Sequence, residues 1–389
     1  MDVPLVHSID MQLAGRFESY EGFGSVAKPK VALSYYPVEW LQFRGAWSQG
    51  FRAPNLPQLF EQGIQRANTR TDFIKCEADL RAGRISNFDD CARGQSVVSN
   101  RSGSLDLEPE KSENWTIGAT LQPPLPSGWG RLTLTADYWQ IKQRDVIGLF
   151  GDTNALILDY LLRLQGSSNP NVQRVDPTAE EIADFEGTGI APVGRVVQVI
   201  DNYTNLTPRT VEGLDLGLYY NLRDTPIGRF DVKLNAARLF KFFQEPGDLQ
   251  QLLLDAQADG TIDPTINVVG AESLIRENGR PKWRGTAIVT WKLGQFGAGY
   301  YGSYVGSVID TGASLADGTR YKVSDHVTHN LYVQYTVDSP TAIDGTRFRI
   351  GVRNLANNLP PLADAPYGYI GDLYSNRGRV FYASLRKRF

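Results

Sequence analysis

The strongest constraint on the fold is an alternation of apolar and polar residues that recurs along most of the chain. Near the start, Ile9, Met11 and Leu13 alternate with polar neighbours, and the same pattern covers residues 31–35 and 41–47. A period of two predicts extended strands with two chemically different faces. A soluble sheet buries its apolar face, whereas an outer-membrane barrel turns that face to lipid and its polar face to the lumen.

The lengths of the connections between strands favour the barrel. Twelve strands are expected, and every second connection is short, while the others include long loops at about 51–111, 148–194 and 245–280. Tight turns at one end and long loops at the other are typical of outer-membrane barrels. Residues 195–222 are expected to form one very long strand. The last five strands are expected at about 282–293, 297–307, 325–336, 347–355 and 379–389.

One of these late strands carries Arg347, Arg349 and Arg353 on a single face, which fits a water-filled lumen better than a soluble core. The 18 Tyr, 17 Phe and 7 Trp residues suffice for two aromatic girdles at the membrane interfaces. The net charge of −3 gives no reason to expect a nucleic-acid partner. The first ten residues lack the features of a signal peptide, so we expect an exported protein to need a longer chain than this.

The first two long loops carry local signals. Cys76 and Cys91 both lie in the first loop between polar flanks, which favours a disulfide over two separate buried thiols. A bridge that closes a loop of this size is worth about 3 kcal/mol in the chain-entropy account. A short helix is expected at about 153–164 in the second loop.

No metal site or cofactor is predicted. The three histidines are dispersed, the two cysteines lie far from them, and no glycine-rich phosphate loop follows a strand. Asp255, Asp259 and Asp263 have the spacing of a calcium loop. However, Gln257 and Ile266 occupy positions where that motif needs carboxylate ligands.

Five segments together resemble one family, the TonB-dependent outer-membrane receptors. Residues 41–63 (LQFRGAWSQGFRAPNLPQLFEQG) contain the S-x-G-F-R-A-P signature of its barrels, and residues 105–118 (LDLEPEKSENWTIG) are similar to its L-x-P-E-K-S segment. The other three are DYWQIKQRDVI, NLTPRTVEGLDLGLYYNL and the C-terminal GVRNLANNLPP with YASLRKRF. The matches keep the family order from about Leu5 to Phe389.

The resemblance implies an all-β fold: part of an antiparallel up-and-down transmembrane β-barrel, with short periplasmic turns and long extracellular loops. Residues 1–389 would form a single barrel region, the C-terminal half of a 22-stranded barrel without the TonB box or plug domain. The implied location is the outer membrane of a Gram-negative bacterium. The implied partners are outer-membrane lipid, the barrel-assembly machinery, a small solute at the extracellular loops and, in the intact receptor, TonB and the plug.

By resemblance, the intact receptor takes up a scarce solute, such as a siderophore, cobalamin or an oligosaccharide. The candidate ligand-facing residues are Arg66, Arg70, Tyr367, Tyr369 and Asp372, each of which could instead be a solvated or loop-packing side chain. Without the plug, the chain alone is not expected to perform gated uptake.

The end of the chain is similar to the family's assembly signal. Phe381, Leu385 and Phe389 keep its same-face pattern, but Lys387 stands where an aromatic residue is usual. The aliphatic stem of a lysine allows its charge to reach the membrane rim. Beside the first signature, Arg52 and Glu61 are expected to tie strand to loop.

Two other classes of protein remain open at this stage. A twelve-stranded outer-membrane enzyme of the phospholipase kind would need a nucleophile, and Ser324 and His326 lie two residues apart. No oxyanion motif accompanies them, so no catalytic residue is predicted and an enzyme is not expected. A soluble β-rich carbohydrate-binding module is the other alternative. That module would fold without detergent.

Overall fold

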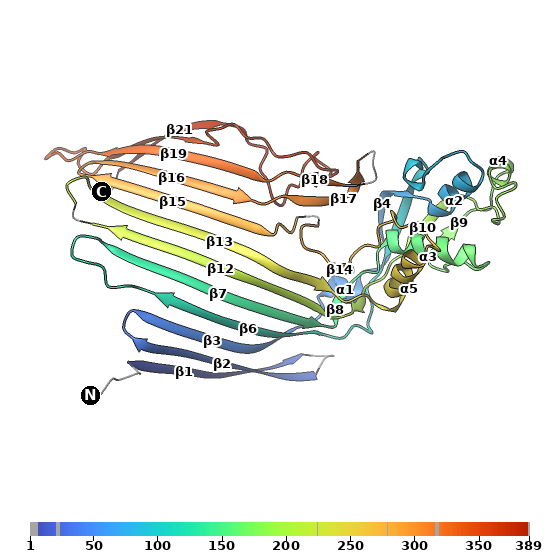
Figure 1. Ribbon diagram of the computed structural model, residues 1–389, viewed down its shortest axis with the longest axis horizontal. Helices are drawn as coiled ribbons and strands as arrows, with labels where there is room; N and C mark the ends of the chain where they lie inside the picture. The colour runs from blue at the N-terminus through green and yellow to red at the C-terminus, as the bar shows by residue number, and fades with distance from the viewer. Residues whose placement is uncertain (1–6, 21–23, 224, 278, 316–318, 388–389) are drawn as a thin grey trace.

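The computed structural model describes residues 7–20, 24–223, 225–277, 279–315 and 319–387. Their dominant feature is one open antiparallel sheet in which twelve strands follow each other in chain order (Figure 1). In this part of the chain, β1 pairs only with β2, and β21 pairs only with β20. In sheet order the strands are β1 (Ser8–Tyr20), β2 (Gly24–Val38), β3 (Leu41–Arg52), β6 (Glu110–Leu121), β7 (Arg131–Arg144), β12 (Arg209–Leu222), β13 (Arg229–Gln244), β15 (Trp283–Leu293), β16 (Phe296–Val305), β19 (His326–Thr336), β20 (Arg347–Arg353) and β21 (Val380–Arg386).

The number of strands and their antiparallel order confirm the fold expected from the alternation. The pairing register brings the apolar residues of successive strands onto one face, because directly opposite residues point to the same side of a sheet. On this face Met11 is 65% exposed, Ile117 63% and Ile350 62%. A soluble protein rarely leaves so wide an apolar face in water, so lipid is its natural environment.

Aromatic side chains gather at both ends of the apolar face, as interfacial girdles require. Near the short connections, the ring pairs are Tyr35 with Phe43 at 6.5 Å and Phe296 with Tyr335 at 5.0 Å. Toward the opposite end, they are Trp47 with Trp115 at 6.2 Å and Tyr138 with Phe240 at 6.4 Å. The apolar face therefore carries an aromatic band at each end.

The opposite face of the sheet is polar. Arg44, Gly118, Asp137 and Asp215 stand side by side across four neighbouring strands. Arg44 reaches over Gly118 and donates from Nε to Asp137 at 2.7 Å. A Cβ at residue 118 would collide with the Asp137 carboxylate and lie 2.8 Å from the carbonyl oxygen of Ala136, so this crossing requires glycine.

The late arginines also line the polar face. The guanidinium of Arg349 lies 4.1 Å from the centre of the Tyr332 ring, and that of Arg353 lies 5.3 Å from the centre of the Tyr382 ring. On the apolar face of β21, Phe381 is 75% exposed and Leu385 66%. Lys387 donates to the carbonyl oxygen of Asp344 at the short-turn end. Phe389 lies outside the described residues.

Long and short connections separate to the two ends of the strands. One end has the connections 39–40, 122–130, 223–228, 294–295 and 337–346, whereas the other has 53–109, 145–208, 245–282, 306–325 and 354–379. The connection between β1 and β2 at this second end is the exception to the long loops. The first three long loops fold together beyond the ends of the strands, and we call this unit the cap (Figure 1).

The first two loops of the cap form much regular structure. The first contains α1 (Leu56–Phe60), β4 (Ile64–Thr71), α2 (Phe73–Arg81), η1 (Phe88–Asp90) and β5 (Gly94–Arg101). The second contains β8 (Val146–Gly148), α3 (Asp152–Leu164), β9 (Val172–Arg174), α4 (Ala179–Asp184), β10 (Val196–Ile200) and β11 (Thr204–Leu206). Helix α3 confirms the helix expected at about 153–164.

The third loop adds α5 (Asp248–Ala258) and β14 (Glu272–Ser273), and β14 pairs with β13. A separate hairpin of β17 (Val308–Ser314) and β18 (Arg320–Val323) follows β16. No helix in the described ranges is both long and apolar enough to cross a membrane.

The prediction of a single long strand at residues 195–222 is wrong. The chain makes three strands there: β10 joins the cap, β11 pairs with β8, and only β12 enters the large sheet. Pro208 stands immediately before β12 and has no N–H group to donate to a ladder. The alternation of residues continued across that break, and alternation alone does not reveal which partner a strand chooses.

Candidate ligand-binding site

The cap has a hydrophobic core of its own, built from all three long loops. Ile74 of α2, Leu161 of α3 and Leu253 of α5 are each at most 1% exposed and belong to the same buried cluster. Beside this cluster, β4, β5, β10 and β9 form a four-stranded sheet in which β5 and β10 run parallel. The loops therefore present one folded surface at this end of the twelve-stranded sheet, which we call the wall.

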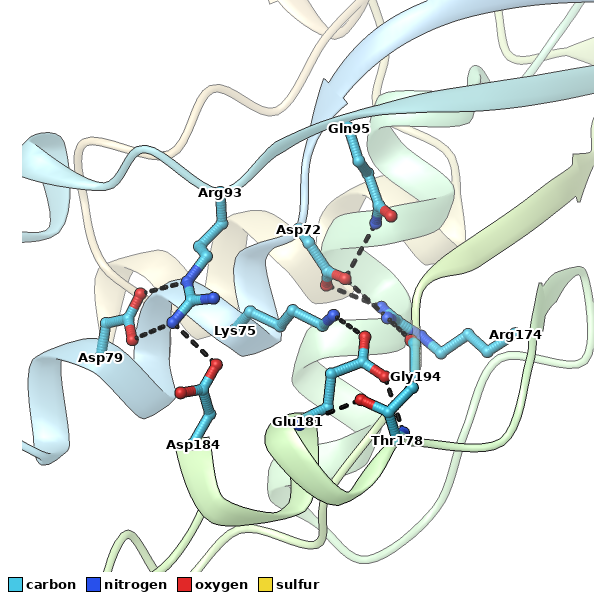
Figure 2. Close-up of polar contacts among 10 residues, drawn as sticks. All are labelled: Asp72, Lys75, Asp79, Arg93, Gln95, Arg174, Thr178, Glu181, Asp184 and Gly194. Carbon is cyan, nitrogen blue, oxygen red and sulfur yellow. Dashed lines mark hydrogen bonds and ion pairs between the residues drawn. The ribbon is translucent and has the colours of Figure 1, made fainter.

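A buried ion pair joins the first loop to the second (Figure 2). Arg174 contacts Asp72 through both terminal nitrogens, at 2.7 and 2.8 Å, and its Nε donates to Asp159 at 3.0 Å. Gln95 donates to Asp72 at 2.9 Å, and Arg163 donates to Asp159 at 2.8 Å. The side chains of Asp72 and Arg174 are only 1% and 7% exposed, so their charges depend on each other.

Two further groups of charges hold α4 against the first loop (Figure 2). Lys75 donates to Glu181 at 2.6 Å, which lowers the pKa of that carboxyl. Arg93 contacts Asp79 at 2.5 and 2.7 Å and reaches Asp184 at 3.0 Å. The hydrogen bond from Arg93 holds the pKa of Asp79 below its ordinary value. These charges are consumed within the cap and are not available to a solute.

A disulfide closes the first loop. Cys76 of α2 is bonded to Cys91, with their Cα atoms 5.5 Å apart. Cys76 is fully buried in the cluster that contains Ile74. The bridge therefore fixes the segment after α2 to the core of the cap.

The polar face of the wall carries an open cavity of about 670 Å³. Arg44, Asp137, Asp215 and Arg284 line it, with Leu373 contributed by the last long loop. Both signs of charge and several hydroxyl and amide groups therefore face this space. We did not single out Arg284 or the two aspartates from the sequence, although each stands on the polar side of its strand's alternation.

The last long loop is anchored by side-chain contacts. Tyr374 is 6% exposed in a cluster with Val308 and Val323, and its ring meets that of His326 at 5.3 Å. The amide of Asn354 donates to the carbonyl oxygens of Asn358 at 2.8 Å and Arg377 at 3.2 Å. The loop is thus held at both of its ends.

The residues expected to face a ligand fall on two different loops. Arg70 of β4 forms an ion pair with Asp152 at 2.8 Å, so its charge is already used within the cap. Arg66, on the same strand, is exposed. In the last loop, Tyr367 is 78% exposed and lies 6.3 Å from Tyr369, ring centre to ring centre.

Of the other residues considered from the sequence, one is exposed and the rest have structural contacts. Asp372 is exposed in the last loop. Arg52 pairs with Glu110 at 2.5 and 2.6 Å where the first loop leaves and rejoins the wall. Asp259 and Asp263 accept hydrogen bonds from the backbone of Thr261 and Thr265, each at 2.8 Å. In the described part of the chain, no three His, Cys, Asp or Glu residues group in a way that could hold a metal ion.

Comparison with solved structures finds the same architecture. The siderophore receptor PirA from Acinetobacter baumannii aligns over 97% of this chain and 43% of its own, with a TM-score of 0.55 and 15% identity. The ferric enterobactin receptor PfeA from Pseudomonas aeruginosa, as the R480A mutant in complex with enterobactin, aligns over 98% of this chain and 43% of its own, with a TM-score of 0.56 and 15% identity. The chain thus spans less than half the length of these receptors. No curated protein sequence matches significantly.

The family assignment comes from the sequence itself. The family described as TonB dependent receptor-like, beta-barrel matches residues 2–355, which is most of the chain. This match agrees with the segments that resembled the family and with the twelve-stranded wall. The family consists of transport receptors of the outer membrane rather than enzymes. The chain belongs to the TonB-dependent receptor-like β-barrel family.

Proposed function

We propose that this chain forms part of an outer-membrane receptor for the TonB-dependent uptake of a scarce solute. The observation that carries the proposal is the two-faced wall of twelve strands whose long loops fold into one cap at one end. A wall of this kind separates lipid from a polar lumen, and a structured cap offers a rigid surface to a solute. The wall and the cap belong to a single barrel region, residues 1–389.

The geometry supports one route for the solute. The solute meets the loops first, where Arg66, Tyr367 and Asp372 are exposed and Tyr369 is half-buried, and then passes the polar cavity beside Arg284. Arg70 supports this surface through Asp152 rather than by contacting the solute. A siderophore is the leading candidate because the structural relatives are a siderophore receptor and a ferric enterobactin receptor. Cobalamin and an oligosaccharide are the alternatives.

Energy coupling and assembly involve other partners. Gated uptake requires a plug domain and TonB, and the wall described here does not provide this gating by itself. On the apolar side, Phe381 and Leu385 face lipid, and together with Phe389 they form the signal for the barrel-assembly machinery. The disulfide between Cys76 and Cys91 fits a loop exposed to the oxidising exterior.

Uptake by cells tests the proposal. The gene for the native protein is deleted from its host. Growth is then measured with a ferric siderophore as the only source of iron, with cobalamin as the only cobalamin source, or with an oligosaccharide as the only source of carbon. We expect the deletion to abolish growth on one of these solutes, the native protein to restore it, and the protein to fractionate with the outer membrane. Unchanged growth on all three, or a detergent-free soluble protein, would show that the proposal is wrong.

A further inference from the structure

Two arginines on the polar face lie next to each other without an acidic partner. Arg209 begins β12, and Arg280 stands shortly before β15. Their guanidinium groups lie 5.6 and 4.8 Å from the centre of the same aromatic ring, that of Phe242. Both arginines are partly buried, and burial lowers the pKa of Arg280.

The register places this arrangement on the lumen side of the wall. Arg209 and Asp215 are six positions apart in a strand that pairs with β7 without interruption. Because six is even, their side chains point to the same face of the sheet. Phe242 is paired with Val211, which shares that face. Arg209 is the first wall residue after the second cap loop, so the pair of arginines lies where the cap meets the lumen.

The acidic residues near the two arginines, Glu110 and Glu277, are already committed. Glu277 forms an ion pair with Arg320 at 3.0 Å, and its backbone oxygen accepts a hydrogen bond from Arg280 at 3.3 Å. Glu110 accepts hydrogen bonds from Arg52 at 2.5 and 2.6 Å and from the backbone of Ile147 at 2.8 Å. Among the described residues, neither Arg209 nor Arg280 forms an ion pair. By contrast, Arg174 of the cap, which is 7% exposed, has two carboxylate partners. This local charge is therefore left uncompensated by the protein.

A hydrogen bond to a buried side chain fixes the orientation of Arg209. Gln244 is 1% exposed and accepts a hydrogen bond from the Nε of Arg209 at 2.9 Å. The amide nitrogen of Gln244 donates to the carbonyl oxygen of Thr207 at 2.6 Å. A buried residue thus holds one edge of the guanidinium, and the terminal nitrogens remain directed away from that edge.

We propose that Arg209 and Arg280 form a subsite for an anionic solute at the entrance to the lumen. This inference rests on the proposed uptake function and narrows the solute to one that carries oxyanion groups, such as carboxylate, phosphate or catecholate. Paired arginines suit such groups because each guanidinium can donate two parallel hydrogen bonds to one oxyanion. Bound anion also removes the repulsion between the two arginines.

Binding by the purified native protein in detergent tests the subsite. The two probes are a negatively charged ferric tricatecholate complex and a neutral ferric trihydroxamate complex, measured at low and high salt. We expect the R209Q/R280Q variant to bind the anionic probe about a hundredfold more weakly, about tenfold for each charge-assisted contact, and to lose most of the salt dependence. The R209K/R280K variant should retain part of the affinity.

The control is R195Q, which removes one positive charge from an exposed arginine of the cap and should leave binding unchanged. Heat-modifiable gel migration establishes that each variant is folded. The inference is overturned if folded R209Q/R280Q binds the anionic probe as native protein does. It is equally overturned if the native protein binds neither probe, or only the neutral one. Growth on the three solutes decides the uptake function separately, so the two failures are distinguishable.

Discussion

The buried pair of Asp72 and Arg174 allows the integrity of the cap to be tested by a single substitution. In R174M, Asp72 loses two hydrogen bonds and Asp159 loses one, while both carboxylates remain buried. Removing one member of a buried ion pair costs about 3–5 kcal/mol because the other charge is left uncompensated. We expect the free energy of opening of the cap to fall by that amount.

Hydrogen exchange measured by mass spectrometry reports this change locally. Peptides from α2 and α3 should exchange roughly 150- to 5,000-fold faster in R174M, since about 1.4 kcal/mol corresponds to a factor of ten. Peptides from β12 and β13 should keep their native rates, because their ladder hydrogen bonds do not depend on the cap. The D72L/R174M double variant should recover part of the loss, since neither charge is then left alone.

The matched control is R81M. Arg81 also contacts a carboxylate, that of Glu77 at 2.7 Å, but its side chain is 41% exposed. Glu77 is 13% exposed but keeps a hydrogen bond from the hydroxyl of Tyr160 at 2.8 Å. Loss of this partly exposed ion pair should therefore cost less than about 1 kcal/mol and accelerate exchange by less than roughly fivefold. The reasoning is refuted if R174M behaves like R81M. It is also refuted if the strands of the wall accelerate as much as the helices of the cap.

Three further perturbations have defined outcomes. G118A should destabilise the wall by about 1–3 kcal/mol through overpacking, seen as a lower temperature of heat-modified migration, whereas G45A, whose Cβ would have 3.9 Å of space, should be neutral. C76S should increase exchange in α2 by an amount equivalent to about 3 kcal/mol, and a reductant should do the same to the native protein but not to C76S. Hydrogen bonds from arginine lower the pKa of Asp79 in the folded protein. The stability that ionised Asp79 contributes is therefore complete above its unfolded pKa of 3.8 and is lost as the pH falls through its folded pKa. Exchange in the cap should accelerate below about pH 4, and less so in D79N.

The wall could be predicted from the sequence because its determinants are local. Alternation located β1, β2 and β3, although the pattern at residues 31–35 covers only part of β2, and it gave the polar face of Arg349 before any partner strand was known. Prediction failed at residues 195–222, where three short segments share one alternation but pair with three different partners. Strand pairing is a non-local property, and a period of two carries no information about it.

The cap and the candidate site were harder to predict for the same reason. Asp72 and Arg174 are separated by about a hundred residues, and nothing in either flank indicates the other. Arg70 looked like an exposed loop cation, but Asp152 from another loop takes its charge. Arg209 and Arg280 each read as ordinary polar residues, and only the fold shows that they share the ring of Phe242.

The wall also explains why such long loops can form a compact cap. Closing a loop of this length costs about 3–4 kcal/mol in chain entropy, and in the folded protein the pairing of the flanking strands meets that cost. Arg52 and Glu110, for example, are already paired where the first loop begins and ends. The cap then needs only its own core, its buried ion pair and its disulfide to become rigid. A cap that depends on the wall in this way should unfold before the wall, and never after it, when both are followed by hydrogen exchange in denaturant.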